Sequence, residues 1–84
     1  MKSIKIVHVF WQDSSVGYGW VDDEELPRPR TINTIGAVVE DTDLYIVIAA
    51  SWDENPTTSA HPWGQVIAIP KTAIAHMDHV RLEA

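Results

Sequence analysis

Two loops of this chain combine aromatic rings with side chains that form hydrogen bonds. The first is FWQDSSVGYGW, residues 10–20, and the second is DENPTTSAHPWG, residues 53–64. Indole and phenol rings offer flat faces for stacking, and Ser, Asp and Asn bond to hydroxyls, amides or base edges. Gly17 and Gly19 let the backbone approach a ligand closely. The candidate ligand-binding residues are therefore Trp11, Asp13, Ser14, Ser15, Tyr18, Trp20, Trp52, Asn55, His61 and Trp63.

The same rings also suit a core or an interface. Phe10 and Trp11 end an apolar segment, so we expect Phe10 in the core and Trp11 at its edge. A chain of 84 residues hardly buries all four of its tryptophans, and exposed aromatic side chains are typical interface anchors. We therefore expect Tyr18 and Trp20 to face a ligand or a neighbouring subunit. The sequence leaves open whether the two loops meet.

Groups suited to catalysis or metal binding are sparse. The chain has no cysteine, no glycine-rich phosphate loop, no nucleophile elbow and no metalloprotease motif. The adjacent acids of Asp22–Glu25 do not form a facing pair on a solvated turn. His76 and His79 share a face on a helix, whereas they lie on opposite faces of a strand, which we prefer here. The sequence predicts a protein that is not an enzyme and uses no cofactor or metal.

Charge and hydropathy narrow the possible partners. Twelve acids against six scattered Lys and Arg residues give a net charge of −6, which disfavours generic binding along nucleic acid. The longest apolar segment, residues 44–50, is far shorter than the roughly 20 residues that span a bilayer. We expect one domain over residues 1–84, cytoplasmic, without membrane contact, and associated as a homo-oligomer because so small a core gains stability by association.

Apolar residues, in partial alternation or in short runs, predict five short strands. They are expected at residues 4–12, 31–39, 44–52, 65–69 and 73–82. The last segment also suits a terminal helix. The acidic residues 40–43 predict a hairpin turn between the second and third strands, and Gly36 predicts a bend or bulge. One helical turn is expected at residues 22–26, and a sharp turn or a single 3-10 turn at residues 70–72.

Five short strands without a long helix predict a small, strongly bent sheet or barrel. The segment GQVIAIPKTAIAHM, residues 64–77, resembles the closing strand pair of bacterial Sm-type RNA chaperones. That resemblance implies an all-β fold: a five-stranded Sm-like or SH3-like barrel in which a short 3-10 turn joins the last two strands.

A second resemblance covers most of the chain. FWQDS, then GW, then TIGAVVEDTDLYIVIAAS, then IPKTAI are similar in arrangement to small accessory proteins of tailed bacteriophages. The resemblance implies a phage product in the host cytoplasm and implies no catalytic residues. Together with the aromatic loops, it favours a protein that sequesters a small nucleotide-like ligand between subunits to counter host defence or regulation.

Three other functions fit the same sequence. An acidic inhibitor would dock on a host defence protein through Asp22–Glu25 together with Glu40, Asp41 and Asp43. An Sm-like RNA binder fits the expected fold and conflicts with the negative charge. The third alternative is a structural or assembly component of the virion.

Overall fold

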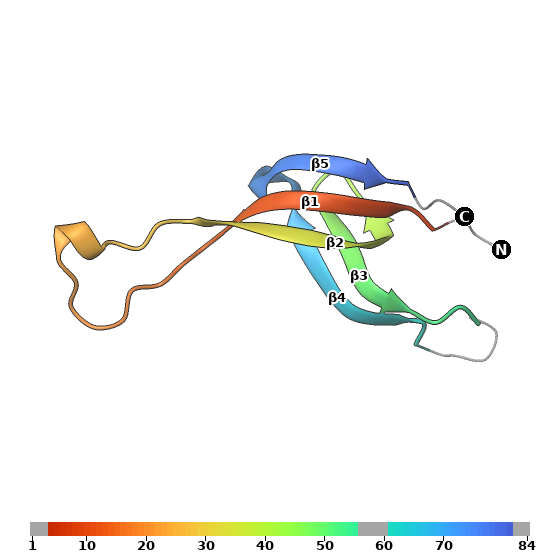
Figure 1. The fold of residues 1–84 in the computed structure, drawn as a ribbon, viewed down its shortest axis with the longest axis horizontal. Coiled ribbons are helices and arrows are strands. Elements are labelled where there is room, and N and C mark those ends of the chain that lie inside the picture. The colour runs from red at the N-terminus through yellow and green to blue at the C-terminus, as the bar shows by residue number, and fades with distance from the viewer. Residues whose placement is uncertain (1–3, 56–60, 82–84) are drawn as a thin grey trace.

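Five antiparallel strands form a single sheet in the computed structural model, which describes residues 4–55 and 61–81. Figure 1 shows them in the spatial order β4-β3-β2-β1-β5. The described elements, in chain order, are β1 (Ile6–Asp13), η1 (Asp23–Glu25), β2 (Arg30–Asp41), β3 (Tyr45–Trp52), β4 (Trp63–Pro70), η2 (Lys71–Ala73) and β5 (Ile74–Val80), where η is a 3-10 helix. The prediction of an all-β fold with five strands is confirmed.

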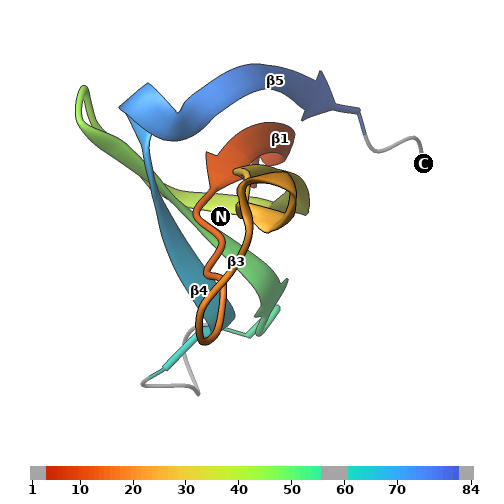
Figure 2. The same cartoon turned by 90° about the vertical axis from the view of Figure 1, so that its left-hand side faces the viewer.

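The main cluster of buried apolar side chains lies on one face of this curved sheet. Along β1 the side chains of Val7 and Val9 are buried, and they alternate with side chains on the opposite face. They pack in one cluster with Ile46, Ile48 and Ile69 of β3 and β4, although β2 separates β1 from β3 in the sheet. The sheet must therefore curve around the core, as Figure 2 shows.

Gly36 of β2 lies close to the backbone of β3. A Cβ atom at this position would lie 2.7 Å from Cγ2 of Ile48 and would collide with the carbonyl oxygen of Ala49. The register shift in β2 falls between Val38 and Glu40. The predicted bulge is therefore displaced from Gly36, and the glycine is explained by the close approach of β3.

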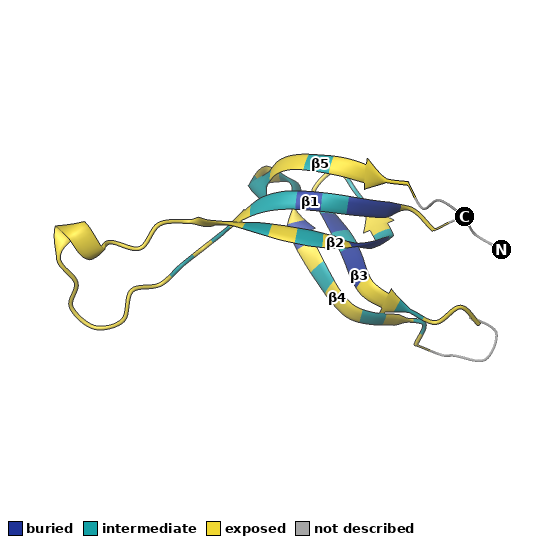
Figure 3. Cartoon of the chain, viewed as in Figure 1, coloured by how far each residue is buried: buried dark blue, intermediate teal, exposed yellow. Residues whose placement is uncertain are grey.

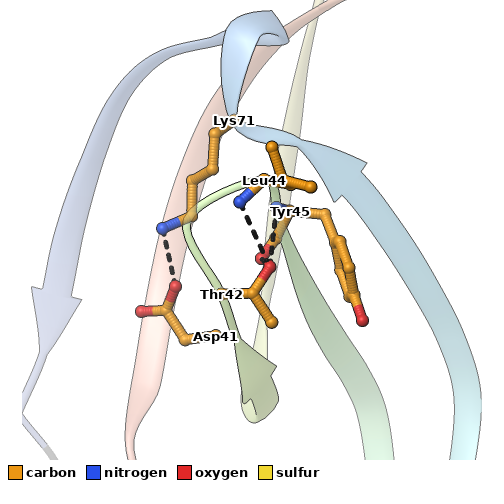
Figure 4. A network of polar contacts seen from close by, with 5 residues as sticks. All are labelled: Asp41, Thr42, Leu44, Tyr45 and Lys71. Atoms are coloured by element: carbon orange, nitrogen blue, oxygen red, sulfur yellow. Dashed lines mark hydrogen bonds and ion pairs between the residues drawn. The ribbon is translucent and has the colours of Figure 1, made fainter.

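The turn between β2 and β3 is fixed by Thr42 (Figure 4). Its hydroxyl donates to the carbonyl of Tyr45 and accepts hydrogen bonds from the backbone N–H groups of Leu44 and Tyr45. The backbone N–H of Lys71 donates to the carbonyl of Leu44 at 2.8 Å, and its ammonium pairs with Asp41 at 2.6 Å. These contacts attach η2 to the hairpin and so set the direction in which β5 leaves.

Tyr45 of the same hairpin interacts with Glu40. The negative charge of Glu40 opposes formation of the phenolate, and its carboxylate accepts a hydrogen bond from the phenol. Both effects raise the pKa of Tyr45 above its ordinary value of 10.0, so the hydroxyl remains a donor through the neutral range.

The boundaries of the later elements differ in detail from the prediction. The last segment is a strand over residues 74–80, so the alternative of a helix is wrong, and residue 82 lies outside the described residues. The 3-10 turn occupies residues 71–73. Trp63 and Gly64, expected in a loop, already belong to β4 because they pair with Trp52 and Ser51 of β3. Within the described residues no helix is both long and apolar enough to cross a membrane.

Candidate functional site

The most prominent feature of the molecule is a projecting segment between β1 and β2. We call residues 14–29 the arm. It leaves the sheet after Asp13 and returns at Arg30, and these two residues are direct partners across the antiparallel strands. The molecule is 54 Å long and about half as wide, and the arm forms one end of the long axis (Figure 1). The connection between the first two strands is therefore a segment that projects from the sheet.

Local hydrogen bonds shape the arm. The carboxylate of Asp13 accepts a bond from the backbone N–H of Ser14, and the hydroxyl of Ser15 donates to the carbonyl of Arg28 on the returning side. Gly19 has φ +75°, a left-handed conformation that suits glycine and redirects the chain just before Trp20. The acidic residues that follow form the single 3-10 turn η1 rather than a longer helix.

Large apolar side chains of the arm are directed into solvent. Trp20 is fully exposed and Tyr18 is 91% exposed, while Val16 and Leu26 are exposed by more than half. Figure 3 shows exposed residues along nearly the whole arm, in contrast to the buried centre of the sheet. Single exposed apolar residues are normal on any protein surface, but four large ones within eleven residues form a concentrated apolar surface.

Acidic groups accompany these apolar side chains. Asp22, Asp23, Glu24 and Glu25 are all exposed, and the only basic residue between positions 14 and 29 is Arg28. Four acids and one base give the arm a net charge of −3, half of the −6 that the whole chain carries. The arm is thus an apolar surface bordered by negative charge.

The second aromatic loop lies away from the arm. Trp52 and Trp63 are partners at the far end of the β3–β4 pair, where Trp52 is half-buried and Trp63 is 37% exposed. Asn55 and His61 are exposed on either side of residues 56–60, which lie outside the described residues. Figure 1 shows the end of β3 and the start of β4 pointing away from the arm. The structure therefore does not bring the two loops together.

Several of the ten predicted site residues have structural contacts within the chain, among them Trp11, Asp13, Ser14 and Ser15. Trp11 packs against the core cluster, and its indole N–H donates to the hydroxyl of Thr34 at 3.0 Å. Its position at the edge of the core agrees with the prediction. Asp13 ends β1 and accepts the bond from Ser14 described above. The arm residues Tyr18 and Trp20 are the predicted aromatic side chains that are most available to a partner.

Phe10 is a correction to the sequence-based prediction. It was expected in the core, but it lies on the face opposite to the core residue Val9, because adjacent residues of a strand point to opposite sides. Its ring stacks on His8 at 4.1 Å and meets His76 at 5.6 Å. Strand alternation correctly places Phe10 beside His8, whereas the extent to which each ring is buried depends on contacts distant in sequence.

The row of rings on β1 and β5 is one group that sequence reasoning missed. The Nε2 atom of His8 is hydrogen-bonded to the side-chain oxygen of Asn33, and that of His76 lies 2.7 Å from the carboxylate of Asp78. The β2-β1-β5 register brings together His8 and Asn33, 25 positions apart, and Phe10 and His76, 66 positions apart. The only sign of this row in the sequence is that His8 and Phe10, and likewise His76 and Asp78, are two residues apart and so share a face of a strand.

Metal ligation has no geometric basis in the described residues. No group of three or more His, Cys, Asp or Glu side chains there is placed to hold an ion. His76 and His79 belong to strand β5, so their spacing of three directs them to opposite faces.

Comparison with protein-family models, with curated proteins and with solved structures found no match to the chain. The functional argument therefore depends on the geometry of the arm and of the sheet.

Proposed function

We propose that this chain is a non-enzymatic binding protein that docks on a partner protein through the arm, residues 14–29. The observation that carries the proposal is the full exposure of Trp20 and the near-full exposure of Tyr18 at one end of the molecule. Trp and Tyr are the residue types most enriched among the side chains that dominate the energy of protein interfaces. A projecting segment also inserts into a groove more readily than a flat surface does.

The arm has the composition of an interface and contributes little to the core. Val16 and Leu26 add aliphatic surface to the two rings, and each large apolar side chain buried on docking contributes about 1.5–3 kcal/mol. The acids of Asp22–Glu25 border this surface, so the complementary partner is a groove with an apolar floor and a basic rim. The charges would accelerate association and select the partner, while the rings would supply most of the affinity.

The two resemblances support a class of partner and a class of fold for this proposal. The similarity to accessory proteins of tailed bacteriophages supports a host protein as the partner, with interference in host defence or regulation as the outcome. The order of strands, with η2 (residues 71–73) between β4 and β5, supports assignment of the bent sheet to the Sm-like or SH3-like small barrels. In this proposal the barrel is the rigid support and the arm is the recognition element.

Replacement of both arm rings tests this function. Immobilised wild-type protein is expected to retain a specific host protein, and the Tyr18→Ala/Trp20→Ala variant is expected to lose about 100-fold in affinity for it. Leu44→Ala is the matched control, because Leu44 is 78% exposed on the β2–β3 turn, far from the arm rings. Retention of the same protein by the double variant with the affinity of the wild type and the control would refute docking through the arm.

Sequestration of a small nucleotide-like ligand is a second candidate function. It is favoured by the exposed faces of Tyr18 and Trp20, on which a base can stack. Because both rings project into solvent, a second copy of the chain would have to cover the ligand from the other side. Native mass spectrometry of the purified protein should then show an oligomer with additional mass that disappears on denaturation. A bare 9.4 kDa monomer would exclude this candidate.

A further inference from the structure

A second region with binding chemistry lies at the end of the sheet remote from the arm. An open hollow of about 300 Å³ is lined by Ile4, Lys5, Ile6, His79, Val80 and Arg81. It forms where the start of β1 meets the end of β5, since Ile6 pairs with Val80 and Val7 pairs with His79. Figure 1 shows these two strand ends side by side.

The charge of this hollow is opposite to that of the rest of the chain. Three of its six lining residues, Lys5, His79 and Arg81, carry nitrogen groups that donate hydrogen bonds, and none is acidic. The β1–β5 register, continued by one residue from Ile6 and Val80, sets Lys5 opposite Arg81. Two like charges opposite each other on neighbouring strands destabilise the pair unless an anion lies between them.

Among the described residues, no carboxylate pairs with Lys5 or Arg81. The same holds for His79, although its neighbour His76 has Asp78. Lys71, in contrast, has an ion pair with Asp41. In a chain of net charge −6, a group of such cations around one hollow is the feature that a bound anion explains.

We propose that this hollow binds a small molecule that carries a phosphate group. The guanidinium of Arg81 can donate two parallel hydrogen bonds to phosphate oxygens, Lys5 supplies a point charge, and His79 supplies a ring donor. Ile4 and Val80, which are 37% and 38% exposed, give the hollow an apolar wall for the remainder of the ligand. A volume near 300 Å³ matches the smaller binding sites for organic ligands, so a nucleoside monophosphate is the class that fits.

This inference is independent of the arm. The lining residues belong to β1, β5 and their immediate flanks, whereas docking uses residues 14–29. Variants of the arm should therefore leave phosphate binding unchanged, and loss of one function should not imply loss of the other.

Titration of the full chain with adenosine monophosphate, followed by amide chemical shifts at constant ionic strength, tests the site. Shifts are expected at residues 5–7 and 79–81, with half-saturation near or below about 1 mM. Inorganic phosphate should move the same amides but bind about tenfold more weakly, because it makes no contact with the apolar wall. The Tyr18→Ala/Trp20→Ala variant should respond as the wild type does.

The matched pair of variants removes equal charge at two places. Lys5→Gln/Arg81→Gln is expected to weaken binding of adenosine monophosphate at least about tenfold. Arg28→Gln/Arg30→Gln, which removes two exposed cations that do not line the hollow, should keep wild-type affinity. Absence of shifts with both probes, or an equal loss in the two variants, would overturn the proposal.

Discussion

Gly36→Ala is expected to lower the free energy of unfolding by about 3 kcal/mol, one of the largest effects of a single methyl group in this chain. The added carbon would collide with the carbonyl oxygen of Ala49 and lie 2.7 Å from Cγ2 of Ile48. The first of these is backbone in the centre of β3, where Ala49 pairs with both Ala37 and Val66. Relief of the clash would therefore require β2 and β3 to separate at this point.

Gly64→Ala is the control for this effect. Its added carbon would come no closer than 3.6 Å to Ser51, an ordinary contact, so the free energy of unfolding should change by less than about 1 kcal/mol. Urea unfolding followed by far-UV circular dichroism compares the two variants. Equal midpoints for Gly36→Ala and Gly64→Ala would show that β2 and β3 do not approach as closely as described.

Replacement of the whole arm is expected to eliminate partner binding while the sheet still folds. Asp13 and Arg30 are direct partners, so Asn-Gly can replace residues 14–29 as a two-residue hairpin turn. The core cluster contains no arm residue, and the Ser15–Arg28 hydrogen bond lies within the arm itself. The midpoint of urea unfolding should remain equal or rise slightly, because a shorter connection has a smaller closure entropy.

A large fall in that midpoint, or loss of cooperative unfolding, would show that the arm supports the sheet. Its exposed side chains would then have a structural use, and the argument for docking would lose its main observation. The Tyr18→Ala/Trp20→Ala variant separates the two cases, because it removes the rings and leaves the connection intact.

Much of the sheet could be predicted from local sequence. Partial alternation along residues 4–12 and the apolar segment of residues 44–52 indicate strands, and the acidic residues 40–43 indicate a hairpin between the second and third strands. The Ile-Pro-Lys-Thr segment likewise indicates a tight turn, found as η2. These features depend on interactions between residues close in the chain, for which turn chemistry and side-chain period are sufficient.

The candidate sites depend on distant contacts and could be predicted only in part. The sequence predicts that a small core does not bury Tyr18 and Trp20, and both are exposed on the arm. It does not show that Trp52 and Trp63 lie away from the arm, because that separation follows from the curvature of the sheet. Nor does it join Lys5 to Arg81, which are brought together only by the β1–β5 register.

The most direct test of the central claim, that the arm is the recognition element, is a capture experiment with immobilised wild-type and arm-replaced protein under identical conditions. The wild type should retain a host protein in stoichiometric amounts, and the arm-replaced protein, once shown to be folded, should retain none of it. Equal retention of that host protein by both would contradict the claim and would assign binding to the sheet.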